Sequence, residues 1–144
     1  ASWFFTPKED KTIGGNRQKL LLLWTAAVSL CIDKLLDVSG QDNISWKPGF
    51  CFRENKAGYC IKVDGGHYVL FNPVNDDGII RYSVTSKKDR LRLLLLAAHE
   101  GAHIVYDWHD ESFSSLKDDI TERVILSQKE ALRKMSAYVC YAKV

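Results

Sequence analysis

The stretch LRLLLLAAHEGAH, Leu91–His103, constrains the fold of this chain more than any other. Its first part, Leu91 to Ala98, is apolar almost throughout, which favours a helix buried on all sides. Ser86 followed by Asp89 resembles a capping box and predicts where that helix begins. Other elements must therefore surround this helix, and polar residues occupy its C-terminal end.

Two further helices are expected on either side of it in sequence. Apolar residues at helical spacing from Leu20 to Leu36 predict a helix from about Asn16 to Val38, with Asn16 as its cap. A last helix is predicted from roughly Asp118 to Tyr141. Its apolar face would carry Ile120, Val124, Ala131, Met135 and Tyr138.

Short aromatic and β-branched segments between the first two helices indicate strands. They are GFCFRE (Gly49–Glu54), GYCIKV (Gly58–Val63) and HYVLFNPV (His67–Val74), with GIIRYSV (Gly78–Val84) as a candidate fourth strand. Turn residues separate them, so we expect a small antiparallel meander. The predicted class is α+β, in the order helix, small sheet, helix, helix.

Length and composition favour one domain. A chain of 144 residues that is 46% hydrophobic can bury a real core, and we assign residues 16–144 to a single domain after an irregular lead-in, 1–15. The net charge of +2 creates no strong field for nucleic acid or an acidic membrane. No apolar run reaches the roughly 18 residues of a membrane span, so no membrane association is expected. The start at Ala1 rather than Met is compatible with a domain excised from a larger parent chain.

The four cysteines, Cys31, Cys51, Cys60 and Cys140, are neither closely paired as in a zinc ribbon nor dense as in a disulfide scaffold. We interpret them as reduced, which predicts an intracellular protein. A bridge between Cys51 and Cys60 across two strands is the alternative.

Three of the four histidines lie within eleven positions. Residues four apart on a helix share a face, so His99 and His103 can direct two imidazoles at one divalent ion such as zinc. Glu100 would then lie beside the ion without being a ligand. His109 can supply a third nitrogen only if the helix stops and the chain reverses near Asp107 and Trp108.

Asp110 is placed to cap a helix that follows the reversal, through Ser112 or Phe113. Asp107, Asp110 and Glu111 are ordinary turn and cap residues. One of them could also accept a hydrogen bond from a ligand imidazole, and Asp110 is our choice.

The string HExxHx5HxxxF, formed by His99, Glu100, His103, His109 and Phe113, resembles the minigluzincin metallopeptidases, which include the WLM, YgjP-like and SprT-like groups. The resemblance implies a zincin-like fold with a small sheet before the zinc helix. It also implies that the three histidines bind Zn²⁺, that Glu100 is the general base and that the aromatic residue packs below the site. Gly101, where a bulky apolar residue is common, and Ser114, where tryptophan is common, depart from the pattern.

The expected function is therefore zinc-dependent hydrolysis of peptide bonds, with Glu100 as the catalytic residue and His99, His103 and His109 as metal ligands. A protein or peptide substrate could pair with an edge strand such as Tyr68 to Asn72. Three tyrosines, Tyr106, Tyr138 and Tyr141, are core residues or stabilisers of a developing oxyanion. His67 is an exposed strand residue or part of the substrate cleft.

Two other functions stay open. One is a catalytically silent, zinc-stabilised docking or regulatory module of a larger protein that contains an ATPase or associates with DNA. The other is a peptidase held inactive by the apolar lead-in residues Trp3, Phe4 and Phe5. The basic group Lys87, Lys88, Arg90 and Arg92 is a solvated face or a contact for an anionic partner, which keeps nucleic acid as an alternative.

Overall fold

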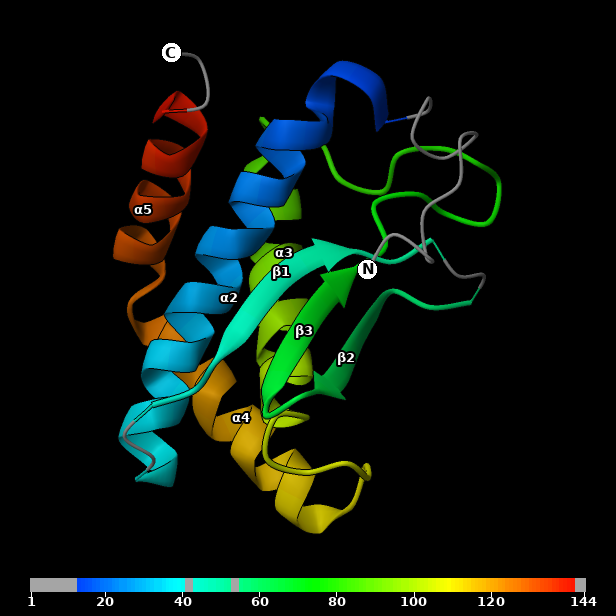
Figure 1. Cartoon of the computed structure of the whole chain (residues 1–144). Coiled ribbons are helices and arrows are strands. Elements are labelled where there is room, and N and C mark those ends of the chain that lie inside the picture. Colours follow the sequence, from blue (N-terminus) through cyan, green and yellow to red (C-terminus); the bar gives the residue numbers. More distant parts are fainter. Residues whose placement is uncertain (1–12, 41–42, 53–54, 142–144) are drawn as a thin grey trace.

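The computed structural model describes residues 13–40, 43–52 and 55–141, and among these the side chains of 13–137 outside the two gaps. The chain forms a short 3₁₀ helix, four α-helices and three strands within this part (Figure 1). In order they are η2 (Gly14–Asn16), α2 (Arg17–Ser39), β1 (Trp46–Phe50), β2 (Gly58–Val63), β3 (Gly66–Phe71), α3 (Lys87–Ala102), α4 (Glu111–Leu126) and α5 (Gln128–Tyr141). The lead-in residues 1–12, with Trp3, Phe4 and Phe5, lie outside the described residues.

The elements stack in three layers. The sheet lies on one side of α2 and α3, with β1 against α2 and β2 against α3, and α4 and α5 pack on other faces of the same two helices. Figure 1 shows α5 on the side of α2 away from the sheet. The α+β class is thereby confirmed.

The sheet itself is mixed, so the predicted antiparallel meander is wrong. Strand β3 lies in the centre, parallel to β1 and antiparallel to β2. The three strands still alternate in direction along the chain, but β1 pairs with β3 instead of with β2. The most apolar strand takes the position paired on both sides, because Val69, Leu70 and Phe71 are fully buried.

The loop between β2 and β3 explains why the pairing of these two strands could be predicted from the sequence. Val63 pairs with Gly66 across a loop of two residues, Asp64 and Gly65, which have φ values of 47° and 80°. Two consecutive positive φ values are the requirement of a type I′ hairpin turn, and Asp-Gly is a preferred sequence for it.

Strand β1 begins earlier than predicted and includes Pro48, which we had expected to precede the strand. Proline lacks a backbone N–H, so it is found mainly in edge strands. The edge position of β1 explains why Pro48 is accepted there.

The candidate fourth strand, Gly78–Val84, is a loop. Its strand-like contact is a single bridge between Val74 and Ile80. The Asn75 side chain accepts hydrogen bonds from the N–H groups of Asp77 and Ile79, both at 3.0 Å, and Tyr82 then turns into the core. This local side-chain bonding competes with strand pairing.

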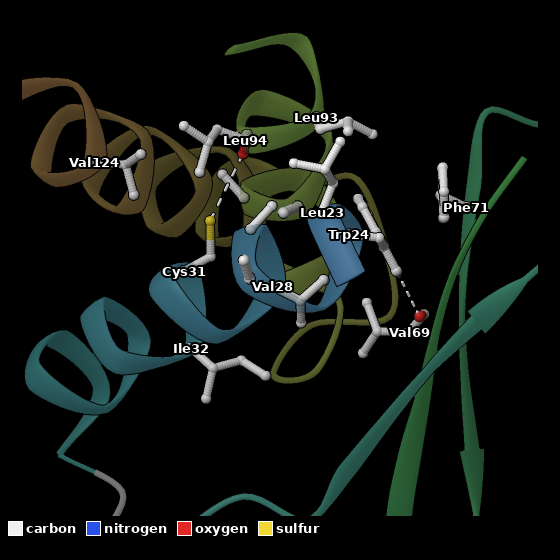
Figure 2. Close-up of a cluster of buried hydrophobic side chains, with 14 of the residues drawn as sticks. Leu23, Trp24, Val28, Cys31, Ile32, Val69, Phe71, Leu93, Leu94 and Val124 are labelled. Carbon is white, nitrogen blue, oxygen red and sulfur yellow. Dashed lines mark hydrogen bonds between the residues drawn. The ribbon is translucent and has the colours of Figure 1, made fainter. Parts of the chain in front are cut away.

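Helix α2 is the centre of the core. Its buried side chains reach further round the helix than the predicted apolar stripe and include Ala26 and Ile32. Trp24 stacks on Phe71 with ring centroids 4.9 Å apart, and its indole N–H donates to the Val69 carbonyl at 2.8 Å (Figure 2). One side chain thus fixes α2 against the central strand. Asn16 precedes α2, but its backbone is helical and its side chain makes no cap bond, so the predicted cap is wrong.

Helix α3 is buried on fewer sides than predicted. Leu93, Leu94, Ala97 and Ala98 are in the core, whereas Leu95 is 49% exposed. The buried side crosses α2, where the Cys31 thiol donates to the Leu94 carbonyl at 3.6 Å (Figure 2). The other side borders an open cavity.

At the start of α3, the Ser86 hydroxyl accepts from Asp89 N–H at 3.2 Å, as the capping box predicted. The Asp89 carboxylate accepts from the Ser83 N–H instead of from Ser86. The box is therefore only half formed.

The predicted last helix is two helices. One helix, α4, begins at Glu111 and ends at Leu126, and α5 begins at Gln128. Ser127 interrupts them with φ −106° and ψ 25°, and its hydroxyl donates to the Arg123 carbonyl at 2.9 Å. The predicted face is nevertheless buried at Ile120, Val124, Ala131 and Met135; the side chain of Tyr138 is outside the described part of the chain.

The thiols of Cys31, Cys51 and Cys60 are unbridged, so the alternative disulfide between Cys51 and Cys60 is not formed; the side chain of Cys140 lies outside the described part. Among the described helices none combines the length and the apolar character needed to span a bilayer.

Candidate metal centre

The end of α3 produces the reversal that the histidine spacing requires. The last helical residue is Ala102, and His103 occupies the C-cap position. The N–H groups of Val105 and Tyr106 both bond to the Ala102 carbonyl, at 3.1 and 3.0 Å, which tightens and closes the final turn. The chain then turns back without a glycine or proline.

The reversal brings His99, His103 and His109 together. One ligand atom from each histidine lies within 4.8 Å of the other two. The ring centroids are 4.7 to 5.2 Å apart, and the Nε2 atoms of His103 and His109 are 2.9 Å apart. The predicted convergence of the three imidazoles is confirmed.

Helix α4 holds the third histidine in place. The Asp110 carboxylate accepts from the Phe113 N–H at 3.0 Å and caps this helix, as its sequence position predicted. Phe113 is 2% exposed, and its ring lies 5.0, 4.4 and 4.9 Å from the rings of His99, His103 and His109. The aromatic side chain therefore contacts all three imidazoles from the protein interior.

The hydrogen-bond partner of a candidate ligand is a backbone group. His103 Nδ1 lies 3.0 Å from the Tyr106 carbonyl oxygen, which can only accept, so Nδ1 carries the proton. In the neutral ring Nε2 then has the free lone pair directed at the cluster. Within the described residues we find no bond from Asp110 to an imidazole, and Tyr106 serves this role instead of the side chain we predicted.

The donor set fits a borderline metal ion. Among the described residues the cluster consists of three imidazole nitrogens without a carboxylate, and such a set is typical of an open zinc site, which keeps a fourth position for water or substrate. Burial first, and then the mutual repulsion of the protonated rings, lowers the pKa of His99 to about 4. Burial also lowers the pKa of His103. Both rings are therefore neutral, and able to bind a metal, at physiological pH.

Glu100 lies next to the histidines but is less exposed to solvent than they are. It is 4% exposed, and burial raises the pKa of its carboxyl to about 7, against a smaller opposing effect of Lys56. A carboxyl that titrates near neutral pH can both accept and return a proton.

Gly58, at the start of β2, makes room for this carboxyl. A Cβ atom on Gly58 would lie 2.9 Å from Glu100 Oε2 and 3.1 Å from both Cδ and Cγ. Those separations are below van der Waals contact, so a residue with a side chain would displace Glu100. The sequence placed Gly58 at the start of a strand but did not predict this contact.

A cavity of about 700 Å³ joins these groups. The described residues around it are Asn55, Lys56, Ala57, Gly58, Tyr59, Cys60, Leu95, Leu96, His99, Glu100, His103, Asp107 and His109. One wall is the outer edge of β2, and the other is α3 with its C-terminal turn. The predicted substrate strand, Tyr68 to Asn72, cannot serve as an edge because β3 is paired on both sides.

Other candidate residues lie elsewhere. His67 borders a separate hollow with Ser45 and Lys47, so it does not line this cavity. The Tyr106 side chain lines another surface hollow beside Ser115. The side chains of Tyr138 and Tyr141 are outside the described part of the chain.

Comparisons of the chain with protein-family models, with curated proteins and with solved structures gave no match.

Proposed function

We propose that this protein is a zinc-dependent metallopeptidase of the minigluzincin type. The observation that carries the proposal is the convergence of His99, His103 and His109 at one side of a cavity that also contains the buried Glu100. A metal site that only stabilises the fold does not require an acidic side chain with a raised pKa beside it, as Glu100 is here.

The chemistry follows from the roles of these side chains. A zinc ion bound by the three imidazoles would supply Lewis acidity towards a peptide carbonyl and would make water acidic enough to ionise near neutral pH. Glu100 takes the proton of the attacking water on its carboxylate and then donates it to the leaving amine nitrogen. Burial raises its pKa above that of an ordinary glutamate, which makes the carboxylate a stronger proton acceptor.

The substrate would bind as an extended peptide along the outer edge of β2. Residues of this strand from Gly58 to Cys60 line the cavity, and among the described strands β2 pairs with β3 alone. A peptide added to a free edge gains backbone hydrogen bonds whatever its side chains, which suits a protein or peptide substrate.

The deciding experiment compares the wild-type protein with Glu100→Gln. Glutamine keeps the shape of the side chain but cannot accept the proton, so we expect unchanged zinc content and at least a 100-fold loss of peptide hydrolysis. Zinc is measured by elemental analysis of the purified protein, and hydrolysis by the release of fluorescence from heavily labelled casein.

His67→Gln is the matched control, because this histidine borders a different hollow. It should keep both zinc and activity. Equal activity of the wild-type protein and Glu100→Gln would refute the mechanism, and a protein purified without stoichiometric metal that takes up no added zinc would refute the site.

A further inference from the structure

A second concave surface lies at the other end of α3 from the histidines. We call it the basic groove, and it measures about 630 Å³. Its described lining residues are Thr85, Lys87, Arg90, Ile125, Leu126, Gln128, Lys129, Leu132, Arg133 and Ser136. The start of α3 forms one wall, and the end of α4 with α5 forms the other.

All ionisable side chains in this lining are cations. They are Lys87 and Arg90 from α3, and Lys129 and Arg133 from α5. The chain has 18 acidic residues against 20 Lys and Arg, so a groove whose described lining has four cations and no acid is a local segregation of charge. The positive end of the α3 dipole points to the same place.

Three of these cations are available to a ligand. Lys87, Lys129 and Arg133 are exposed and make no ion pair within the described part of the chain. Arg90 is different, because Nη1 donates to the Ser136 hydroxyl, and Nε and Nη2 donate to the Val84 carbonyl at 3.2 and 2.7 Å. Arg90 ties the two walls together and so fixes the width of the groove.

The same groove contains exposed aliphatic side chains. Ile125 is 52% and Leu126 is 80% exposed, at the point where Ser127 interrupts α4 and α5. Exposing two adjacent large aliphatic residues costs solvation free energy of about 1 kcal/mol or more each. A partner that covers them would recover that free energy.

We propose that the basic groove docks a peptide segment of a partner protein, with acidic side chains for the cations and aliphatic side chains for Ile125 and Leu126. The charge complementarity is specific, because three free cations and two exposed aliphatic side chains line the same groove. Anchor side chains repeated at helical spacing on such a segment would reach both features at once.

The composition of the lining favours a peptide over nucleic acid. Single-stranded nucleic acid is held by aromatic side chains that stack on bases, and no aromatic residue is among the described lining residues. Phosphate contacts alone would leave Ile125 and Leu126 uncovered. The acidic peptide satisfies both the charged and the apolar parts of the groove.

The test measures fluorescence anisotropy of a fluorescein-labelled helical peptide that has Leu and Glu on one face, titrated with the full chain at physiological salt. Two groove variants are compared with the wild-type protein, Lys129→Glu/Arg133→Glu and Leu126→Ser. All three positions are exposed, so folding should be unaffected. The control, Lys47→Glu/Lys62→Glu, makes the same change in net charge at two exposed positions of the sheet.

We expect the double groove variant to weaken binding about tenfold or more and Leu126→Ser about threefold, with the control within about twofold of the wild-type protein. A peptide with Lys in place of Glu should not bind. Three results would each overturn the proposal: no binding of the Leu/Glu peptide, equal weakening by the control, or tighter binding of labelled single-stranded DNA that depends on the same residues.

Discussion

The contact between Gly58 and Glu100 shows how one backbone position can set the place of a reactive group. The carboxyl approaches the β2 backbone so closely that a Cβ atom would lie 2.9 Å from Oε2. Because Gly58 also lines the cavity, displacement of Glu100 would move the carboxyl relative to the histidines.

Gly58→Ala should therefore lower kcat for casein hydrolysis at least tenfold while zinc content stays at the wild-type level, since misplacement of a catalytic group by about 1 Å is costly. Steady-state kinetics on labelled casein, with elemental analysis of the same samples, would measure both.

Gly15→Ala provides the control, because a Cβ atom on Gly15 would have no atom within 4 Å apart from its neighbours in the chain. It should keep the wild-type kcat and zinc content. If Gly58→Ala were as active as Gly15→Ala at matched zinc content, steric displacement of Glu100 would not set the place of the carboxyl.

The raised pKa of Glu100 predicts a pH effect on stability in the metal-free protein. Burial raises the folded-state pKa to about 7, whereas the ordinary pKa of a glutamate carboxyl is 4.5. The free-energy penalty for keeping this carboxyl buried is therefore absent below about pH 4.5, grows as the pH rises from 4.5 to about 7, and is complete above pH 7. Glu100→Gln removes this penalty. The variant should gain up to about 3 kcal/mol in unfolding free energy relative to the wild-type protein between pH 5 and pH 8.

Urea denaturation in the presence of a chelator would measure this difference at each pH. Glu111→Gln, which also removes one acidic side chain but at an exposed position of α4, is the control. A constant difference between Glu100→Gln and the wild-type protein across this range would show that the carboxyl is not desolvated.

The three clustered histidines could be predicted from the sequence, but their surroundings could not. Helical periodicity places His99 and His103 on one face, and six residues are too many for His109 unless the chain reverses, so the cluster was predictable. The contact with Gly58 and the bond from His103 to the Tyr106 carbonyl involve backbone atoms. Backbone atoms are the same in every residue, so no residue type signals them.

At the scale of elements, the crossing of α2 and α3 depends on small side chains. Gly101 is buried in α3, and a Cβ atom there would lie 4.0 Å from Cys31 Cβ, which is ordinary contact. The glycine is therefore not required by space, and it weakens the helix relative to alanine.

Gly101→Ala should raise the free energy of unfolding by about 0.5 kcal/mol, because alanine restricts the unfolded chain and fits the existing gap. Gly101→Leu, which supplies the bulky residue common in minigluzincins, should lower it by about 1 to 3 kcal/mol by overpacking against Cys31. Chemical denaturation would measure both. If Gly101→Leu raised the free energy of unfolding instead, the space between α2 and α3 at this crossing would have to be wider than the structure shows.

The strand order and the continuity of the last helix were mispredicted because tertiary packing decides them, whereas the fourth strand is lost to local hydrogen bonds of Asn75. A two-residue turn at Asp64 and Gly65 identifies the hairpin locally, whereas the pairing of β1 with β3 depends on which strand buries most apolar surface. Periodicity likewise continues through Ser127, since Val124 and Ala131 are seven residues apart and face the same core. Because the interruption between α4 and α5 keeps the apolar residues on one face, the periodicity of the sequence does not reveal it.

At the scale of the whole molecule, the histidine cluster connects the C-terminal end of α3 with the exposed loop that precedes α4. His99 and His103 belong to α3 and its C-cap, and His109 lies in the loop before α4. That loop is exposed from Tyr106 to Asp110, and Trp108 is 80% exposed. A bound ion would therefore link α3 to the start of α4 where side-chain packing is sparse.

This link predicts a metal-dependent stability of the complete chain. A ligand that binds only the folded state at a free concentration about 1000 times its Kd adds about 4 kcal/mol to the unfolding free energy. For a chain of this length that corresponds to a rise in Tm of roughly 10 °C. Zinc added to the chelator-treated protein should produce this shift in scanning calorimetry, and renewed chelation should reverse it.

His109→Ala separates the site from general effects of zinc. It removes the ligand nearest to solvent and leaves the core untouched, so its metal-free Tm should lie close to that of the metal-free wild-type protein while most of the zinc-induced rise is lost. His67→Ala, at a histidine in a separate hollow, should keep the full rise. If both variants responded to zinc as the wild-type protein does, the ion would be bound elsewhere, and the three imidazoles would not form the metal site on which the proposed hydrolysis depends.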